Sequence, residues 1–523
     1  MSKINSIVVV GGGSAGWMTA ATLIKFFPEK TISLIESADV PTVGVGESTL
    51  GQINEWLHIL DIKEDDFMKY TDAGLKMSIK FTDWAGKGSG GFHYPFGDSW
   101  NVGTVFGVND WFIKKAKYPG TPNTDFAECF FPAMQLVNQN KIIKNENDEL
   151  PGWRYDSDVA YHFDATKFGM WLREEYCKPR GVQHIVGTIK EDIETDSAGV
   201  KCVELTTGEK ITADLYIDCT GWKSLLLGKA LGVPFESYSD ILPNNSAWAT
   251  RMPYTDKESQ LEPYTNCTAI EHGWVWNIPL WSRIGTGYVF SDAYVSNEDA
   301  LEEFKRYLKE NNPADLIDTL EFKLIKMRVG IHEELFHKNV CAIGLSAGFI
   351  EPLESNGLFT VHEFLHRLVK TLSRDDISLI DKVGFNEANR GDFRAFAEFV
   401  SMHYLLSQRS DTQYWRDARE RKFNNGKRIP GDFLGYGFDN AIFKRDVQSM
   451  YDSSTGGALF IAAGLNYFPI TESVIKRSEF KFNRRLDYVN DSFDIWESNK
   501  TYWKKIADAA PTLYQFLKDK YNV

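Results

Sequence analysis

The sequence has few cysteines and no pairing pattern among them. Six lie scattered through 523 residues, without a Cys-x-x-Cys motif or another paired spacing. Such thiols are typical of a reducing compartment, and their spacing indicates no structural zinc site. We therefore expect a cytoplasmic protein whose cysteines stay reduced and which holds no metal.

Long hydrophobic runs are also lacking, and positive charge is not in excess. No apolar segment is long enough to cross a bilayer, and the first residues are too short and too rich in glycine for a signal peptide. The net charge of −14 disfavours a nucleic-acid backbone or an anionic membrane surface as a partner. We expect neither nucleic acid nor membrane to bind.

Aromatic residues, in contrast, are abundant: 15 Trp, 22 Tyr and 35 Phe. Large aromatic cores explain such a content by default, whereas a ring-lined pocket for a flat ligand is the sharper interpretation. The chain exceeds the usual size of a single core, so two or three packed modules are expected.

A β-α-β unit is predicted at the start of the chain. Residues 6–10 read as a buried strand, residues 15–27 as a helix and residues 31–35 as a second strand. Further strands are expected at residues 213–218 and 339–343, each before a glycine turn. Distant pieces of one sheet would therefore be joined by long insertions.

The first glycine turn has the sequence G-G-G-S-A-G, which matches G-x-G-x-x-G between a strand and a helix. Gly11 is expected to permit the tight turn, Gly13 to let a pyrophosphate approach the backbone, and Gly16 to let helix and strand pack closely. The helix N-terminus at Ser14 and Ala15 would present unpaired N–H groups to the phosphates. A tight turn without a ligand is the alternative.

Glu36 closes the second predicted strand, twenty residues after Gly16. A carboxylate there can accept hydrogen bonds from ribose hydroxyls and repels a 2′-phosphate, so NADP is disfavoured. Two later glycine turns, one after Asp218 and one beginning at Gly344, suit strands that return to touch a flavin or its ribityl chain. An NAD dehydrogenase has no need of them, so the expected cofactor is FAD.

These features predict an α/β protein with a Rossmann-like FAD-binding fold of the flavin monooxygenase type. Alternating residues between 247 and 322 indicate an inserted antiparallel sheet, and the pattern after residue 381 is mostly helical. We expect residues 1–380 to form the FAD-binding module with the inserted, substrate-facing sheet. Residues 381–523 are expected to form a mostly helical cap on the substrate pocket.

Four blocks in this sequence resemble the flavin-dependent tryptophan halogenase family, and they occur in the family's order. The blocks are the glycine turn followed by Trp17, the V-G-E-S-T loop with Gly46, Glu47 and Ser48, the G-W-V-W-N-I-P block with Trp274 and Trp276, and the G-F-I-E-P-L-E-S-N-G block of residues 348–357.

The resemblance implies an FAD-dependent halogenase that receives reduced FAD from a separate flavin reductase. Reduced FAD and O2 would oxidise a halide ion to hypohalous acid, which halogenates a small, electron-rich, indole-like ring. Gly46, Glu47 and Ser48 would form a second flavin loop.

Lys76 matches the family's catalytic lysine, in the stretch A-G-L-K-M-S-I-K-F. Its ammonium can hydrogen-bond hypohalous acid, or its neutral amine can form a haloamine, and the sequence leaves both open. Lys80 is the rival, because both lysines alternate with apolar residues and would share one face of a strand. A solvated surface lysine is the default interpretation of any lone lysine.

Glu354 matches the carboxylate that lies near this lysine in the family. It would stabilise the cationic arenium ion and remove the ring proton, although capping of the following turn is the ordinary interpretation. Ser355 is expected to position the substrate or the lysine. The amides of Asn356 and Gly357 would bind the halide. The family usually has threonine at the position of Asn356, which leaves the halide preference open.

Four aromatic residues complete the expected site. Trp274 and Trp276 are read in the family as a barrier between the flavin and the substrate, with ordinary core aromatics as the alternative. Tyr94 and Phe96 fall where tryptophan-specific members have a His-x-Phe that sandwiches the indole, so Phe96 fits and Tyr94 replaces the histidine. Residues that would hold the amino-acid end of free tryptophan cannot be placed around residues 450–467, so a plain indole or another electron-rich arene is equally well supported.

Two other functions are weighed against the halogenase. An FAD-dependent aromatic monooxygenase would hydroxylate the ring without halide, which Lys76 and the tryptophan pair disfavour. A non-catalytic flavoprotein would have no need of Lys76 together with Glu354 and the halide turn. The sequence leaves open the native substrate, the ring position and whether the chain forms a homo-oligomer.

Overall fold

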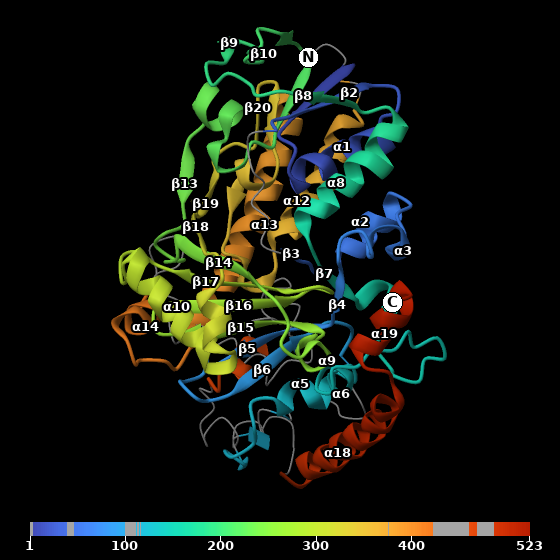
Figure 1. Ribbon diagram of the computed structural model, residues 1–523, viewed down its shortest axis with the longest axis vertical. Coiled ribbons are helices and arrows are strands. Elements are labelled where there is room, and N and C mark those ends of the chain that lie inside the picture. The colour runs from blue at the N-terminus through green and yellow to red at the C-terminus, as the bar shows by residue number, and fades with distance from the viewer. Residues whose placement is uncertain are drawn as a thin grey trace. The chain divides into compact units, whose positions relative to one another are not determined.

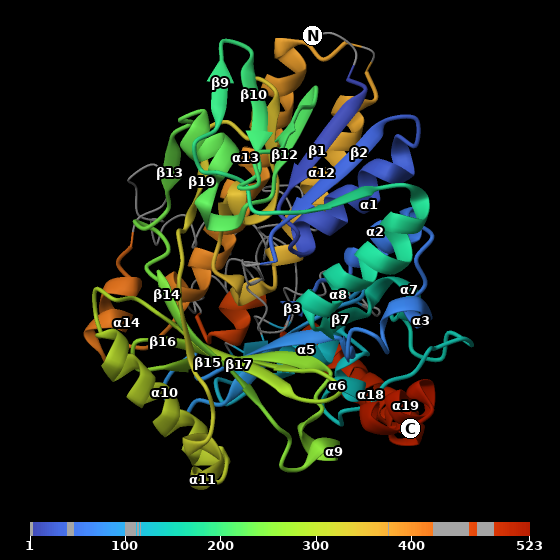
Figure 2. The same ribbon diagram turned by 45° about the horizontal axis from the view of Figure 1, so that its top comes forward.

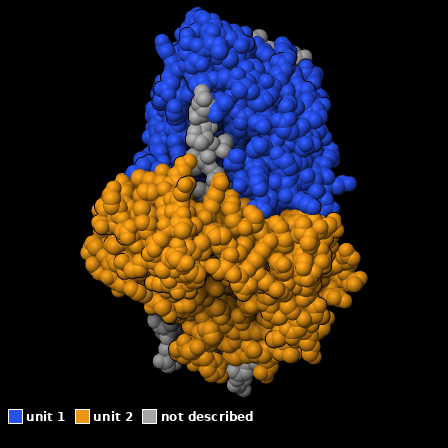
Figure 3. Space-filling model, in the orientation of Figure 1, with its two compact units in different colours: residues 1–74, 161–245, 325–395 blue, residues 75–160, 246–324, 396–523 orange. Residues whose placement is uncertain are grey.

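The structure is a computed structural model that describes residues 4–38, 47–99, 111, 114–115, 117–374, 376–421, 460–467 and 486–523 (Figures 1 and 2). The chain forms two compact units, each assembled from three stretches (Figure 3). Unit 1 comprises residues 1–74, 161–245 and 325–395, and unit 2 comprises residues 75–160, 246–324 and 396–523. The division after residue 380 into an FAD-binding module and a cap stays a prediction.

Unit 1 is built on a six-stranded sheet with the strand order β20–β21–β12–β1–β2–β8, of which Figure 2 labels β12, β1 and β2. All neighbours pair in parallel except β20, which joins β21 in the antiparallel direction. The strands of the unit are β1 (Ser6–Val10), β2 (Thr31–Glu36), β3 (Glu47–Ser48), β7 (Ala160–Phe163), β8 (Gln183–Val186), β9 (Glu194–Asp196), β10 (Gly199–Glu204), β11 (Lys210–Ile211), β12 (Leu215–Asp218), β13 (Phe235–Ser237), β19 (Gly330–His332), β20 (Phe336–His337), β21 (Val340–Ala342) and β22 (Gly348–Phe349).

The register of this sheet gathers the predicted nucleotide-binding turns at one edge. Val10 is opposite Ile35 and Asp218, and Asp218 is opposite Ala342, so the carboxyl ends of four parallel strands are level. In open parallel sheets, ligands bind beyond these ends. The predicted Rossmann-like α/β fold is confirmed.

Helix α1 lies between this sheet and further helices. Residues 16–24 of α1 are all buried, because the helix packs on β1 and β2 and is covered by α8, η1 and α12 (Figure 1). The helices of unit 1 are α1 (Ser14–Phe26), α2 (Ile53–Ile59), α3 (Glu64–Phe67), α8 (Ala165–Trp171), η1 (Leu172–Cys177), η2 (Lys178–Arg180), η3 (Gly221–Lys223), η4 (Leu225–Ala230), η5 (Gly344–Ser346), η6 (Pro352–Glu354) and α12 (Gly357–Leu372).

Unit 2 contains a mixed sheet in which β14, β17, β16, β15, β5 and β6 are neighbours in that order. The pairings are antiparallel except that of β15 with β5, and they confirm the inserted antiparallel layer. The strands that lie wholly or partly in unit 2 are β4 (Gly74–Lys76), β5 (Ser78–Thr82), β6 (Gly91–Pro95), β14 (Ser246–Met252), β15 (Tyr264–Ile270), β16 (Gly273–Pro279), β17 (Ile284–Phe290) and β18 (Lys323–Lys326).

One face of this sheet forms a hydrophobic core with α10. Val275 and Tyr288 pack there with Phe304 and Leu308 of the helix. Because side chains alternate along a strand, the residues on either side of Val275 project from the opposite face. The helices of unit 2 are α5 (Asp125–Phe130), α6 (Met134–Val137), α7 (Tyr155–Asp158), α9 (Lys257–Gln260), α10 (Asn297–Asn311), α11 (Ala314–Asp318), α14 (Gln413–Ala418), α18 (Leu486–Ala509) and α19 (Leu513–Tyr521).

The described residues of the last third of the chain are mostly helical, as predicted. Helix α13 (Leu379–Leu406) runs from unit 1 into unit 2, and residues 460–464 form a further helical segment. Helix α18 packs on α5 and α6, and a buried carboxylate ties it down: Asp125 accepts hydrogen bonds from Lys500 and from Trp111 Nε1 at 2.8 Å.

Two general expectations can be compared with the structure. All six cysteines are free thiols, five of them buried. Among the helices that the structure describes, none has both the length and the apolar character that a bilayer crossing requires.

Candidate active site

The surroundings of three glycines in the first glycine turn show why each position has no side chain. Gly11 has φ +116°, and a Cβ there would lie 2.2 Å from the carbonyl oxygen of Cys219. A Cβ on Gly16 would lie 1.9 Å from the carbonyl oxygen of Gly11. A Cβ on Gly13 would meet no described atom within 4 Å. Gly11 and Gly16 are thus required by packing, whereas Gly13 leaves its backbone open to a ligand.

Helix α1 begins directly after this turn, and the described side chains do not cap it. No side chain accepts a hydrogen bond at its N-cap, and its first turn has no acidic residue. The Ser14 hydroxyl instead donates to the Ala165 carbonyl oxygen at 3.0 Å. Gly344 (φ +71°) packs closely here, because a Cβ on it would lie 2.7 Å from Ala15 Cβ. The N–H groups that no described side chain caps and the helix dipole suit a pyrophosphate.

Glu36 lies beside the same turn and has two partners that the sequence did not predict. Its Oε2 accepts hydrogen bonds from Arg173 Nη1 at 3.2 Å and from His184 Nε2 at 3.0 Å. Arg173 belongs to η1 and His184 to β8, more than a hundred residues further along the chain. No motif marks either residue, so only the folded sheet reveals the group.

The second predicted flavin loop is described only in part. Gly46 lies outside the described residues, and Glu47 begins β3, where it is opposite Phe163 of β7. The Ser48 hydroxyl accepts a hydrogen bond from the Ser355 hydroxyl at 3.1 Å, and both residues are buried. The structure therefore brings together one residue from the predicted flavin loop and one from the predicted halide turn.

The halide turn precedes helix α12. Ser355 has a left-handed backbone with φ +59°, and Asn356 takes the N-cap position without a side-chain cap bond. Asn356 is buried, and its Oδ1 makes no hydrogen bond to any described atom. Glu354 is also buried. It belongs to unit 1 and Lys76 to unit 2, so their pairing stays a prediction.

Lys76 is fully buried, which excludes the default reading of a solvated lysine. It ends strand β4, and its Nζ lies 4.9 Å from the centroid of the Phe96 ring. This distance is in the range of cation–π contacts. The predicted catalytic lysine and one predicted substrate-stacking ring are therefore neighbours within unit 2.

Lys80 has different surroundings from Lys76. The chain leaves β4 at Met77, whose N–H donates to the Pro263 carbonyl oxygen at 2.7 Å, so Lys80 belongs to the next strand, β5. Its Nζ lies 5.4 Å from the centroid of the Tyr264 ring. It is opposite His93, whose pKa burial lowers to about 3. Lys80 therefore faces a neutral imidazole.

The sheet register places the predicted barrier and one predicted substrate ring on the same face. Across neighbouring strands, Trp276 of β16 is opposite Cys267 of β15, which is opposite Phe81 of β5. On the last strand, β6, Tyr94 is opposite Ile79, which lies on the same face of β5 as Phe81. These residues share the face away from Val275 and α10, whereas Lys80 lies on the α10 side.

Trp274 and Trp276 are both buried, with ring centroids 6.2 Å apart. A Cβ on Gly287 would lie 2.2 Å from the Trp276 ring, so this glycine makes room for the indole. Ordinary core packing explains the burial of these two rings as well as a role as a barrier does.

Tyr94 lies in an aromatic group that the sequence did not identify. Its ring centroid is 4.9 Å from that of Phe460 and 6.2 Å from that of Phe399. The helical segment of Phe460 packs directly on β6, because a Cβ on Gly464 would lie 2.0 Å from the Phe92 ring. Residues 460–467, the described part of the stretch considered for substrate binding, therefore contribute an apolar ring.

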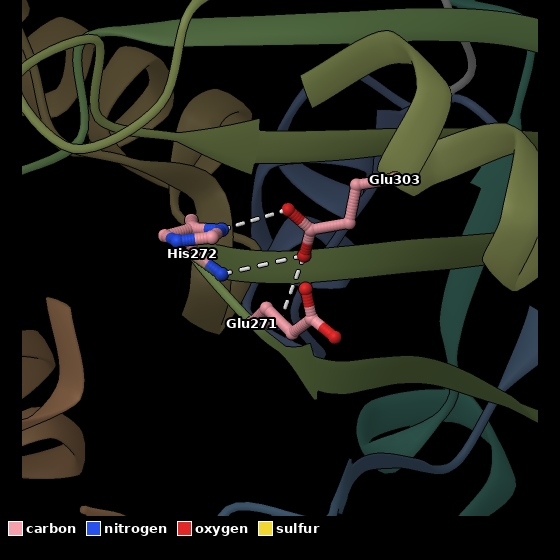
Figure 4. A group of neighbouring side chains, drawn as sticks. All are labelled: Glu271, His272 and Glu303. Atoms are coloured by element: carbon pink, nitrogen blue, oxygen red, sulfur yellow. Dashed lines mark hydrogen bonds and ion pairs between the residues drawn. The ribbon is translucent and has the colours of Figure 1, made fainter. Parts of the chain in front are cut away.

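One group in the described residues has metal-ligand composition. Glu271, His272 and Glu303 place ligand atoms within 4.8 Å of one another (Figure 4). Glu303 Oε1 accepts the N–H groups of residues 271 and 272 at 2.9 and 3.3 Å, and Oε2 accepts His272 Nδ1 at 2.9 Å and the Tyr288 hydroxyl at 3.1 Å. The hydrogen bond to Glu303 raises the pKa of His272. Because both oxygens are fully used, the group is better described as an anchor for the β15–β16 hairpin.

Three comparisons with known proteins were made, and those with a family model and with curated relatives identify the same family. A family model described as tryptophan halogenase matches residues 6–472. The tryptophan 6-halogenase SttH of Streptomyces toxytricini is 36% identical over 437 residues, which cover 80% of this chain and 81% of that protein. The tryptophan 7-halogenase RebH of Lentzea aerocolonigenes is 30% identical over 545 residues, covering 99% of both. The VirX1 apo structure is 36% identical, covers 99% of both chains and gives a TM-score of 0.90.

Proposed function

Since this chain belongs to the tryptophan halogenase family, we propose that it halogenates an electron-rich, indole-like ring and that Lys76 directs the halogen. It is a flavin-dependent enzyme that uses a separate flavin reductase. One observation carries the proposed role of Lys76: its buried amine lies over the ring of Phe96, where an aromatic substrate is expected to stack.

FAD fits the first glycine turn of unit 1. When bound in its reduced form, it supplies with O2 the oxidising power that turns a halide ion into hypohalous acid. Support comes from the open backbone at Gly13 and the uncapped start of α1. The residues that we propose to hold FAD are Gly11, Gly13, Ser14, Ala15, Gly16, Glu36, Gly46, Glu47, Ser48 and Gly344.

The residues of unit 2 are proposed to guide the oxidised halogen. The Lys76 amine would hold it by a hydrogen bond or as a haloamine, and both forms place it beside Phe96. Tyr94 and Phe96 would stack the substrate ring. Trp274 and Trp276, whose rings are buried and 6.2 Å apart, would separate the substrate from the flavin.

The residues of the halide turn are proposed to complete the reaction. Glu354 would stabilise the arenium cation and take up the ring proton, for which a buried carboxylate is suited. Ser355, fixed by its bond to Ser48, would hold the substrate or the lysine. The amides of Asn356 and Gly357 would bind the halide before its oxidation.

The names of the relatives support an indole substrate, because SttH is a tryptophan 6-halogenase and RebH a tryptophan 7-halogenase. Free tryptophan and a plain indole both remain candidates. A cytoplasmic location is proposed from the six free thiols.

The test is a product assay with halide as the variable. The protein would be incubated with FAD, a flavin reductase, NADH, and indole or tryptophan, together with chloride, bromide or iodide. We expect mass shifts that correspond to the added halogen and disappear when halide is omitted. A hydroxylated product without halide would instead establish the monooxygenase. Absence of product with every halide and arene would favour the non-catalytic flavoprotein.

A further inference from the structure

The two oxygens of the Glu36 carboxylate have unequal surroundings. Oε2 accepts hydrogen bonds from both Arg173 and His184, at 3.2 and 3.0 Å. Oε1 has no hydrogen bond to any described atom. The side chain is only partly exposed, so one oxygen is held by the protein while the other is left for a ligand.

The position of this carboxylate relative to the glycine turn is fixed by close packing. A Cβ on Gly12 would lie 2.3 Å from Glu36 Cγ and 2.4 Å from Cδ. The Gly11 N–H donates to the Ile35 carbonyl oxygen at 2.9 Å, which ties the turn to the end of β2. Glu36 therefore lies against the turn that would carry the pyrophosphate, where the adenosine ribose is expected.

The two donors are themselves held in place. Arg173 Nε also donates to Glu174 Oε1 at 2.8 Å, and Glu174 accepts Lys178 at 2.7 Å. His184 is opposite Leu34 in the parallel β2–β8 pair, and its ring meets the Trp17 ring edge-on at 5.2 Å. Donors that are already fixed can orient a third group at little entropic cost.

We propose that Arg173 and His184 are positioning residues for the adenosine half of FAD. By binding Oε2, they turn Oε1 of Glu36 toward the 2′- and 3′-hydroxyls of the ribose. This inference rests on the proposed FAD site and concerns binding alone, not the halogenation step.

The test is a titration with oxidised FAD, followed by the quenching of flavin fluorescence. Arg173→Leu and His184→Leu, which remove every side-chain donor, are each expected to raise the Kd for FAD about tenfold, the loss typical of a hydrogen bond to a charged group. His184→Gln keeps an N–H donor and is expected to bind FAD nearly as the wild type does. Lys201→Leu is the control, because it removes a positive charge of unit 1 that bonds Glu194 and has no link to Arg173, His184 or Glu36.

A second ligand separates positioning from a general structural effect. An FAD analogue whose adenosine lacks the 2′- and 3′-hydroxyls cannot use Glu36, so both damaging variants should bind it as the wild type does. Equal weakening of FAD and the analogue, or no weakening of FAD, would overturn the inference. If the wild type binds FAD in the expected pattern but halogenates no arene, the proposed function fails and this inference stands.

Discussion

Replacing Gly13 with alanine separates the folding of the nucleotide-binding turn from its binding of the ligand. Gly13 has φ −74° and ψ −179°, which alanine adopts without strain, and the added Cβ would meet no described atom within 4 Å. Because alanine is a poorer N-cap residue than glycine, the free energy of unfolding of the cofactor-free protein should fall by no more than about 1 kcal/mol. The same methyl group would occupy the surface where the pyrophosphate approaches the backbone. Losing one hydrogen bond to a charged phosphate raises the Kd roughly tenfold to a hundredfold.

Two comparison variants make this prediction specific. Gly16→Ala brings a Cβ to 1.9 Å from the Gly11 carbonyl oxygen, so it should destabilise the cofactor-free protein by about 1–3 kcal/mol or more. Gly384→Ala lies inside α13 with no described atom near the new Cβ, so it should raise the free energy of unfolding by up to about 1 kcal/mol and leave FAD binding unchanged. Urea unfolding and FAD titration would be run on all three variants. Binding of FAD to Gly13→Ala with the wild-type Kd would refute the assignment of this turn to the pyrophosphate.

Two further predictions concern stability. The hydrogen bond to Glu303 raises the pKa of His272. The protonated imidazole therefore stabilises the folded protein fully at pH values below the ordinary histidine pKa, and this stabilisation is lost as the pH rises through the raised pKa. The wild-type advantage in Tm over His272→Gln should therefore shrink from acid to alkaline pH, and a constant difference would contradict this account. Asp125→Asn should lower the free energy of unfolding in urea by about 3 kcal/mol, because Lys114 and Lys500, both mostly shielded from water, lose their buried carboxylate partner. Asp508→Asn, at a surface pair, should change it by less than about 1 kcal/mol, and similar losses in both variants would disprove the distinction.

Local sequence patterns were sufficient for the nucleotide-binding turn. A run of β-branched residues, a glycine turn and a long apolar helix predicted β1, α1 and their connection nearly as the structure has them. The reason is that each feature depends on neighbours only a few residues away. The need for glycine at positions 11 and 16 comes from close packing within this segment and against Cys219, which follows β12.

Contacts between distant segments could not be predicted in the same way. Arg173 and His184 reach Glu36 only because β8 joins β2 in parallel, a pairing for which the sequence has no local signal. Alternation suggested a shared face for Lys76 and Lys80, but the chain passes from one strand to another between them. The ring of Phe460 beside Tyr94 is likewise a product of the tertiary fold.

The most direct test of the account is the conversion of Lys76 to methionine, which keeps the length of the buried side chain and removes the amine. Halogenated indole and bound FAD would be measured on the same preparation, supplied with reductase, NADH and bromide. We predict that FAD binds with unchanged Kd while halogenated product falls by about a hundredfold or more, the range of a positioned proton donor. Halogenation by Lys76→Met at the wild-type rate would contradict the assignment of the buried amine as the group that directs the halogen.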